Sequence, residues 1–352
     1  ITMLHQFFDQ NGYHTGVIGK LVQMRFQNEP VVANGIDEYS PLGPGWRSDQ
    51  REAEPSTLIG EYYAYEGSDD YLVDSEKKRR AITFLQNAAH KEEPFYLYVG
   101  FRNTHRQAYV PARYFELYPP ESLSLPPEPS DAQRQELGQL FGGRGAPLTP
   151  TEEQEYLILR QGYFASATYL DDMIGEILDA TEKLDLLQDT IIVFFSDHGE
   201  STTPWQGGKG SLWRDGTRVP LIIYDKGRTG NGLVCGQPVE LVDLYPTLAQ
   251  LTDLPIPADM DGRSAVPLLD NPTFPWQDFA QTTHIRGNTL GRVISNEQYR
   301  YIDWEDFPSQ LYDIQADPLE YENLADDPAY ASLIDDLKNQ IIDSDVPLER
   351  ND

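Results

Sequence analysis

Five side chains in this sequence could hold an anion or a metal ion, and each follows a predicted strand or the loop after one. They are Lys20, His105, Asp197, His198 and Lys209. The carboxyl ends of the strands of an open parallel sheet share one edge, where ligands collect, so we expect these side chains to converge. Two lysines, two histidines and one carboxylate at one point would suit a dianionic ester.

The most informative segment is Ser-Asp-His-Gly-Glu at residues 196–200, directly after the apolar run Ile191–Phe195. Asp197 and His198 can direct an oxygen and an imidazole nitrogen at one ion, and Gly199 permits the tight turn that this needs. A polar loop that caps a helix would use the same residue types. The position at the end of a buried strand favours the ligand-binding interpretation.

The other candidate positions gain weight only from this convergence. Glycines on both sides of Lys209 let the backbone approach a ligand while the ammonium reaches an anionic oxygen, although a surface turn has the same composition. The spacing there does not match a phosphate-binding P-loop. His105 follows the predicted strand that ends at Gly100, but a lone loop histidine is more often exposed or a cap. His284 and Arg286, near the start of the C-terminal region, either contact substrate or cap a loop.

The formal net charge of −30 over 352 residues argues against nucleic acid and anionic membranes as partners. The longest basic run, Lys77–Arg80, lies among acids in a helical pattern. The single cysteine, Cys235, excludes a disulfide within the chain and a zinc–thiolate site. No apolar run reaches the roughly 18 residues of a membrane span. The first residues lack a signal-peptide pattern and are expected to lie inside a domain, in the middle of a helix.

Helical patterns and apolar strand patterns alternate up to about residue 270, which predicts an α/β fold with a mainly parallel sheet flanked by helices. After Pro275 an antiparallel meander over residues 292–313 and a final helix over residues 330–342 predict a small C-terminal subdomain. The predicted domains are therefore 1–274 and 275–352. The predicted strands before the meander cover residues 15–20, 94–100, 190–195 and 219–224. The longer predicted helices cover residues 68–89, 152–183 and 241–251. Residues 27–68 and 119–150 are expected to be loops.

Four separated motifs, in the right order, resemble type I sulfatases of the alkaline phosphatase superfamily. They are Asn-Gly-Tyr-His-Thr-Gly-Val-Ile-Gly-Lys at residues 11–20, the helical segment Tyr163–Asp171, the stretch from Ser196 to Leu221, and Leu-Tyr-Asp-Ile-Gln-Ala-Asp-Pro at residues 311–318 followed by Glu322–Ala325. The region from Phe101 to Tyr118 and the order of the motifs most resemble the iduronate-2-sulfatase branch. The resemblance covers essentially the whole chain and implies an alkaline-phosphatase-like fold.

The resemblance implies hydrolysis of a sulfate ester, with a sulfated sugar as one candidate substrate. Asp197 and His198 match ligands of the metal ion of the family, usually calcium. Lys209 matches the lysine that holds the sulfate, and Lys20 matches the lysine near the nucleophile. His105 matches the histidine beside the leaving-group oxygen, which implies a general acid. The chemistry of the family is attack on sulfur by a hydrated formylglycine made from Cys or Ser, while the metal and the lysines stabilise charge on the sulfuryl oxygens.

The sequence departs from the family pattern in three places. The nucleophile motif, a Cys or Ser with Pro and Arg two and four positions later, is absent, and Cys235 lies too far downstream to replace it. The first strand, with its paired aspartates for calcium, is absent as well. Gln23 stands near the place of an expected histidine. We therefore expect roughly a hundred residues before Ile1 in the parent protein, including a missing core strand, and we expect this chain alone to be inactive.

Two alternatives remain open from the sequence. One is a catalytically inactive relative, and the other is a phosphatase or phosphonate hydrolase of the same superfamily. The second would show additional His and Asp ligands for two metal ions, whereas the sequence offers one Asp-His pair. The substrate and the oligomeric state cannot be read from the residues. The habit of the family and the acidic composition predict a periplasmic or extracellular protein.

Overall fold

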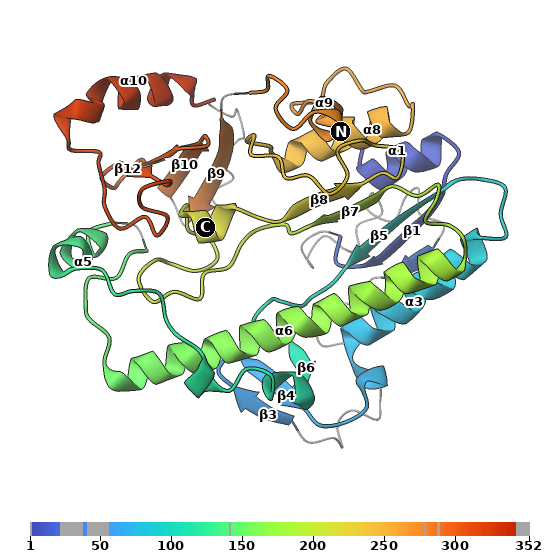
Figure 1. Cartoon of the computed structure of the whole chain (residues 1–352), viewed down its shortest axis with the longest axis horizontal. Helices are drawn as coiled ribbons and strands as arrows, with labels where there is room; N and C mark the ends of the chain where they lie inside the picture. The colour runs from blue at the N-terminus through green and yellow to red at the C-terminus, as the bar shows by residue number, and fades with distance from the viewer. Residues whose placement is uncertain are drawn as a thin grey trace. The chain divides into compact units, whose positions relative to one another are not determined.

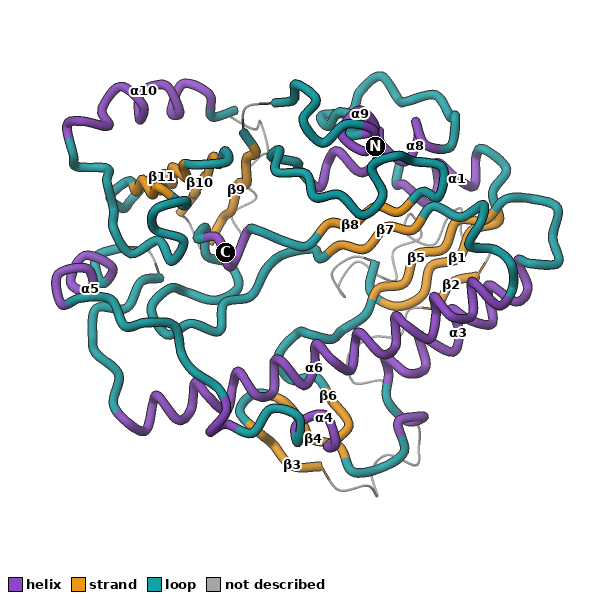
Figure 2. Tube along the Cα trace, viewed as in Figure 1, coloured by secondary structure: helices purple, strands orange, loops and turns teal. Residues whose placement is uncertain are grey.

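The computed structural model describes residues 2–21, 38–40, 56–140, 142–277, 279–286 and 289–342. The chain divides into two compact units. The first comprises Ile1–Leu125 and Pro150–Thr190, and the second comprises Pro126–Thr149 and Ile191–Asp352. Figure 1 labels the helices and strands of both units, and Figure 2 distinguishes them from the loops by colour.

A three-stranded parallel sheet lies in the first unit, in the order β2-β1-β5. Its strands are β1 (His14–Gly19), β2 (Glu38–Ser40) and β5 (Phe95–Gly100). Strands β1 and β5 pair residue by residue, from His14 with Phe95 to Gly19 with Gly100. The two strands therefore end at the same level, and the segments that follow them leave the sheet side by side.

Two long helices, α3 (Val73–Ala88) and α6 (Pro150–Lys183), run side by side in the first unit (Figure 1). Helix α3 packs on the sheet through a cluster that includes Phe84 and Ile18 of β1, and Ile177 of α6 joins this cluster. Helix α1 (Leu4–Gln10) begins after its N-cap residue Met3, so the first residues do not lie in the middle of a helix as expected, and it ends at the C-cap residue Asn11. These elements confirm the sequence-based predictions of the main helices and strands in this unit.

A second sheet of the first unit has the strand order β3-β4-β6. The expected loop over residues 27–68 is therefore wrong for residues 56–65, and β2 shows that it is also wrong for residues 38–40. Strands β3 (Ser56–Ile59) and β4 (Tyr62–Tyr65) form a hairpin, and β4 pairs in parallel with β6 (Tyr109–Pro111). Tyr62 is fully buried and packs in a cluster with Tyr169 of α6. The third strand is only three residues long and comes from a distant part of the chain, so no local pattern could reveal this sheet.

The second unit contains β7 (Ile192–Phe195) and β8 (Leu221–Tyr224), which pair antiparallel. The prediction of a mainly parallel sheet therefore holds for β1, β2 and β5 but not for this pair. A parallel neighbour needs a long crossover connection, usually a helix. Between β7 and β8 the only helix is the four-residue α7 (Arg214–Thr217). The chain that leaves β7 therefore comes back as β8, antiparallel to β7 and directly beside it.

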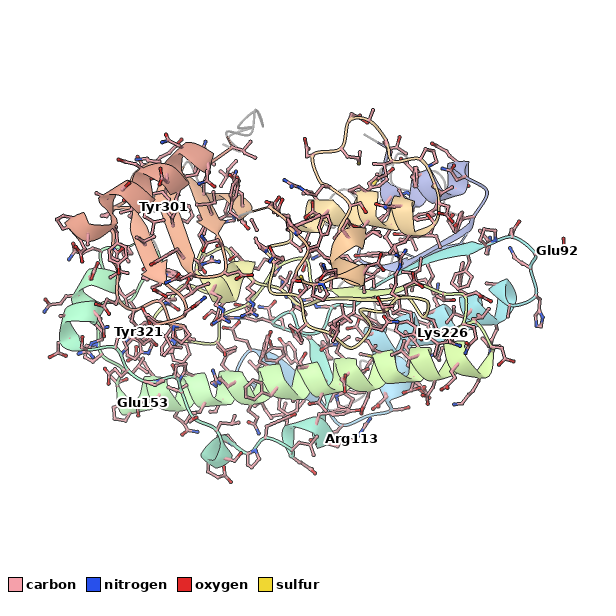
Figure 3. The ribbon with its side chains drawn as sticks, turned by 45° about the horizontal axis from the view of Figure 1, so that its top comes forward. Glu92, Arg113, Glu153, Lys226, Tyr301 and Tyr321 are labelled. Carbon is pink, nitrogen blue, oxygen red and sulfur yellow. The ribbon has the colours of Figure 1, made fainter. Side chains whose placement is uncertain are left out.

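An antiparallel meander in the order β12-β11-β10-β9 confirms the predicted C-terminal antiparallel sheet. Its strands are β9 (Ala280–Arg286), β10 (Thr289–Ser295), β11 (Tyr299–Trp304) and β12 (Gln310–Asp313), of which β9 was not predicted. Tyr301 is fully buried, and Figure 3 marks its place in this sheet; it packs in a cluster with Leu337 of α10 (Ala331–Gln340). The predicted boundary after residue 274 stays a prediction, because both sides of it lie in the second unit.

The remaining helices are short. They are α4 (Ala112–Phe115), α5 (Asp131–Leu137), α8 (Leu244–Leu251) and α9 (Val266–Asp270). Helix α5, capped by Ser130, shows that the expected loop over residues 119–150 is wrong for residues 131–137. Among the residues that the structure describes, no helix has the length and apolar character needed to cross a membrane.

A buried ion pair joins the meander to the segment between β7 and β8. Arg300 of β11 is 5% exposed and Glu320 is 2% exposed, and Arg300 Nε lies 2.7 Å from Glu320 Oε1. The Arg300 guanidinium also donates to the carbonyl oxygen of Leu212 at 2.6 Å and to Thr217 Oγ1 at 2.7 Å. Glu320 Oε2 accepts from the backbone N–H of Arg214 at 2.7 Å. The pair thus holds the turn at residues 212–217 in place.

The packing of α6 on Tyr62 generates a stability prediction. A Cβ atom on Gly162 would overlap the buried Tyr62 ring, whereas a Cβ atom on Gly175 of the same helix would meet nothing within 4 Å. Gly162→Ala should therefore lower the free energy of unfolding by about 1–3 kcal/mol. Gly175→Ala should raise it by about 0.5–1 kcal/mol, since alanine is the better helix former. Urea unfolding followed by circular dichroism measures both, and equal effects would contradict the packing.

The Arg300–Glu320 pair generates a second stability prediction. Glu320→Gln should lower the free energy of unfolding by about 3–5 kcal/mol, because it leaves the Arg300 charge buried without its counterion. The control is Glu322→Gln, which removes the same charge from an exposed neighbour and should change it by less than about 0.5 kcal/mol. Chemical denaturation measures the difference. A Glu320→Gln effect as small as that of the control would mean that the pair does not hold the turn.

Candidate functional site

Two predicted site residues, Lys20 and His105, follow the two strands of the first unit that end at the same level. The backbone N–H of Lys20 donates to the carbonyl oxygen of Gly100 at 3.0 Å, which extends the pairing by one residue. His105 lies in the turn that begins after Gly100, and its N–H donates to the carbonyl oxygen of Arg102 at 2.8 Å. Lys20 is half-buried and His105 is exposed. The structure therefore places both residues at one edge of the sheet, as predicted for this pair of strands.

The imidazole of His105 has a defined tautomer. Its Nδ1 lies 2.8 Å from the backbone carbonyl oxygen of Arg106. A carbonyl oxygen can only accept, so Nδ1 carries the proton and donates it. In the neutral ring Nε2 then holds the lone pair, and Nε2 is the atom that can take up or release a proton. A buried residue also fixes the loop that carries His105. The hydroxyl of Tyr62 donates to the carbonyl oxygen of Thr104 at 2.9 Å.

Asp197 and His198 directly follow β7 in the second unit, as predicted. His198 Nδ1 lies 2.7 Å from the carbonyl oxygen of Gly199, so His198 has the same tautomer as His105. Its Nε2 lies 3.8 Å from Asp197 Oδ1. The turn is fixed by a hydrogen bond from the N–H of Gly199 to the carbonyl oxygen of Gly216, at 3.0 Å. A carboxylate oxygen and an imidazole nitrogen therefore lie close to each other.

The donor atoms of Asp197 and His198 fit two positions of a metal site. Two ligand atoms that each lie about 2.4 Å from one ion, with a right angle between the two bonds, are roughly 3.4 Å apart. This is close to the 3.8 Å between His198 Nε2 and Asp197 Oδ1. The Asp197 side chain is 59% exposed and the His198 side chain 33%, so water and further ligands can reach the same ion. Within the described residues no group of three or more His, Cys, Asp or Glu side chains could hold a metal ion. The pair can contribute to such a site but does not complete it.

Lys209 and His284 lie close together in the second unit. A Cβ atom on Gly210, which has a φ of 84°, would lie 3.2 Å from His284 Nε2, so the ring of His284 lies against this glycine. The backbone N–H of Lys209 donates to Glu200 Oε1 at 3.0 Å. Glu200 therefore links the segment of Asp197 to the segment of Lys209. Sequence reasoning did not assign this role to Glu200, and the only available signal was its place at the end of the 196–200 motif.

The site predictions thus fall into two sets, one in each unit. Lys20 and His105 follow the neighbouring ends of β1 and β5 in the first unit, and Asp197, His198, Lys209 and His284 lie in the second. The convergence of the two sets on one ester group stays a prediction. Arg286 ends β9, but its side chain, like the whole of Gln23, lies outside the described residues.

An open cavity of about 530 Å³ in the first unit lies away from these residues. Asp69, Arg113, Tyr114 and Asp172 are among its lining residues, and Figure 3 marks Arg113 beside α6. The Tyr114 hydroxyl donates to Asp172 Oδ2 at 2.7 Å, and burial together with this carboxylate raises the pKa of Tyr114 to about 12. Arg113 forms an ion pair with Asp69 and lies over the Tyr114 ring. These contacts join the lining residues to one another and give the cavity a structural role.

Two family models match the sequence. The model described as "Sulfatase" matches residues 1–254. The model described as "N-sulphoglucosamine sulphohydrolase, C-terminal" matches residues 208–346. Together they span the Asp197, Lys209 and His284 segments and the antiparallel meander.

The chain is also similar to curated relatives. A sulfatase of Formosa agariphila is 29% identical to it, over 96% of this chain and 68% of the relative. The iduronate 2-sulfatase of Mus musculus is 26% identical, over 95% of this chain and 78% of the relative. The second match supports the predicted likeness to the iduronate-2-sulfatase branch.

Solved structures share the fold. The phosphonate monoester hydrolase of Agrobacterium radiobacter superimposes with a TM-score of 0.74 at 20% identity, over 96% of this chain and 78% of that one. A structure titled as a complex with its substrate D-glucosamine-2-N,6-O-disulfate superimposes with a TM-score of 0.68 at 21% identity, over 96% and 80%. At these identities the likeness concerns the fold, which confirms the predicted alkaline-phosphatase-like α/β class.

The sequence motifs, the fold and the family model agree. Because the sulfatase model matches residues 1–254 of the 352, the chain belongs to the sulfatase family, the type I sulfatases of the alkaline phosphatase superfamily, which are hydrolases of sulfuric esters.

Proposed function

We propose that this protein removes sulfate from a sulfated saccharide, with Lys20 and Lys209 holding the sulfuryl group and His105 as the general acid. Asp197 and His198 would bind a calcium ion, and His284 and Arg286 would contact the substrate. Export to the periplasm or the cell exterior belongs to the same proposal and rests on the acidic composition and the habit of the family.

The observation that carries the proposal is the matching tautomer of two histidines. In both His105 and His198 a backbone carbonyl oxygen accepts from Nδ1, so Nε2 is the ring atom that can exchange a proton or bind a cation. The two rings differ in what lies near Nε2. For His198 it is the carboxylate of Asp197, at 3.8 Å, which suits a shared cation. His105 is exposed at the end of the sheet, which suits proton transfer to a bound ester.

The residues of this chain suit the breaking of a sulfate ester. An oxygen nucleophile forms a bond to sulfur while the bond from sulfur to the ester oxygen breaks. His105, protonated at Nε2, would give its proton to that ester oxygen, which then leaves as an alcohol. A sulfate monoester carries one negative charge, not the two of the dianionic ester expected from the number of cations, and more negative charge develops on the leaving oxygen as its bond breaks. The ammonium groups of Lys20 and Lys209 would hold the sulfuryl oxygens throughout.

Two further components follow from the likeness to the family. Calcium, when bound, would supply Lewis-acid stabilisation of the sulfuryl oxygens. The nucleophile would be a hydrated formylglycine, and these 352 residues contain no Cys/Ser-x-Pro-x-Arg motif to provide it. Asp197 and His198 would supply two of the ligands of the ion. The carboxylate oxygen of Asp197 suits calcium, which prefers oxygen ligands, and the imidazole nitrogen of His198 suits it less well.

A sulfated saccharide is the substrate class that the comparisons support best, since one structural neighbour is titled as a complex with a disulfated glucosamine. The formal net charge of −30 would repel a long polysulfated polymer, so a short saccharide suits this chain better. Hydrolysis of a phosphonate or phosphate ester is the second candidate, because a phosphonate monoester hydrolase shares the fold. The single Asp-His pair favours the sulfatase.

Activity tests the proposal directly. Protein expressed from the complete reading frame should release sulfate from an aryl sulfate. Lys209→Met should lower kcat/KM at least about 100-fold, because a charged contact to the transition state is lost. The control is Lys226→Met, which removes an exposed lysine of the same unit (Figure 3) and should change kcat/KM by less than about 2-fold.

The other outcomes of this assay are informative. Faster cleavage of a phosphonate monoester than of any sulfate ester would favour the second candidate. The proposal would be rejected if none of these esters were turned over and the reading frame lacked the nucleophile motif. That result would support a catalytically inactive relative.

Calcium binding gives a test that needs no turnover. Isothermal titration with calcium chloride should show that Asp197→Asn weakens binding at least about 10-fold, because a charged oxygen ligand becomes a neutral amide. Asp189→Asn removes an exposed carboxylate away from the pair and should leave the affinity unchanged. Tighter binding of magnesium or manganese than of calcium would assign the site to another ion.

A further inference from the structure

We infer that Asp74 is a positioning residue that fixes the loop of His105 by a buried, charged tether. The inference deepens the proposed function and rests on it, because it concerns the residue proposed as general acid. Asp74 itself is buried in the first turn of α3, where it cannot touch a substrate.

The Asp74 carboxylate accepts from four donors. The backbone N–H of Arg102 lies 3.0 Å from Oδ2 and 3.1 Å from Oδ1. The backbone N–H and the side-chain amide of Asn103 donate to Oδ2 at 2.8 Å and 2.6 Å. The fourth donor is the ammonium of Lys77, at 2.8 Å. Three of these four donors belong to the two residues that lead from β5 into the turn of His105.

Asn103 carries the tether across to α6. Its side-chain oxygen accepts from the hydroxyl of Ser166, which is fully buried, at 2.6 Å. One residue after Asp74, the hydroxyl of Ser75 lies 2.8 Å from that of Tyr169, also on α6. The loop is thus attached to two helices that pack on each other, and neither attachment depends on the exposed side chain of His105.

The same ion pair also touches the segment of Lys20. A Cβ atom on Gly19 would lie 2.9 Å from Lys77 Cε, so the stem of Lys77 lies against the last residue of β1. Lys77 is 1% exposed. One buried pair therefore lies under both strand ends that carry predicted site residues of the first unit, which ties the position of one to the position of the other.

Energetics favour a positioning role over a stabilising one. Well-packed apolar residues usually stabilise a fold at least as well as a buried ion pair. The N–H groups of Arg102 and Asn103 point at the Asp74 carboxylate. Leaving either one buried without an acceptor would lower the free energy of unfolding by about 1–3 kcal/mol. Burial alone would raise the pKa of Asp74, but Lys77 and these amides hold it below its ordinary value. The tether is therefore charged above the ordinary aspartate pKa of about 3.9 and is lost only as the pH falls through the lower folded value.

A double-mutant cycle separates positioning from general stability. Asp74→Asn should lower kcat for an aryl sulfate at least about 10-fold and change KM little, because a shift of about 1 Å in a reacting group can cost 100-fold. In the background of His105→Ala the same substitution should lower kcat by less than about 2-fold. Glu76→Gln is the matched control, since it removes a carboxylate of the same helix that pairs with Arg79 and Arg80 and should leave kcat unchanged. Equal losses in both backgrounds would overturn the inference.

Amide hydrogen exchange provides a readout that does not depend on turnover. The amides of Arg102 and Asn103 should exchange at least about 10-fold faster in Asp74→Asn than in Glu76→Gln. Ser166→Ala keeps the ion pair and should produce a smaller increase at the same amides, which covers the case in which Asp74→Asn does not fold. Unchanged exchange in both variants would refute the tether.

The two proposals fail in different ways. Absence of sulfate release from the wild-type protein would reject the proposed function, and the tether would then be decided by exchange together with the ring-nitrogen chemical shifts of His105. Those shifts should show one tautomer in the wild type and a mixture in Asp74→Asn. Normal turnover with an additive cycle would reject the tether alone.

Discussion

Backbone amides in the buried loops between strands must find acceptors, and buried carboxylates accept from such amides in both units. Asp74 accepts from the amides of Arg102 and Asn103, and Glu320 accepts from the amide of Arg214. Each of these two buried carboxylates has a buried cation beside it, because an unpaired charge would be too costly to remove from water. The loops at the strand ends therefore owe their shapes to charges inside the fold rather than to contacts among themselves.

In this arrangement the residues that fix the loops are different from the residues proposed to react. Lys77 and Arg300 neutralise the buried carboxylates and are almost inaccessible. His105 lies exposed on the loop that the Asp74–Lys77 pair holds, and Lys209 lies exposed on a segment whose backbone Glu200 holds. A protein with a formal net charge of −30 can keep cations at such positions, because the buried carboxylates Asp74 and Glu320 are each neutralised by a buried cation. An anionic ester would then meet cations at the strand ends although the molecule as a whole repels it.

The family assignment and the geometry contribute different parts of the functional argument. Membership of the sulfatase family establishes the class of reaction, hydrolysis of sulfuric esters. The geometry supports the proposed roles of the Nε2 atoms of His105 and His198 and of the Oδ1 atom of Asp197. The saccharide, the calcium ion and the formylglycine go beyond both and belong to the proposal.

The sequence by itself determined the family, the order of the main elements and most of the candidate site. Apolar runs and helical periods are local patterns, so β1, β5, β7 and the long helix α6 could be predicted closely, and the 196–200 motif marked the Asp-His pair. Short strands without such patterns, β3, β4, β6 and β9, could not be found, and the antiparallel pairing of β7 with β8 depended on what lies between them.

Only the tertiary structure decided which polar groups support the site, because those contacts join distant parts of the chain. Asn103 and Ser166 are 63 residues apart, and Arg300 and Leu212 are 88 apart. Asp74 looks like any acid in the first turn of a helix until β5 brings the amides of Arg102 and Asn103 to it. Glu200 gained its role in the same way, when the turn after β7 placed it beside the backbone of Lys209. A local pattern encodes burial and periodicity, but a hydrogen bond between remote segments exists only once the fold has formed.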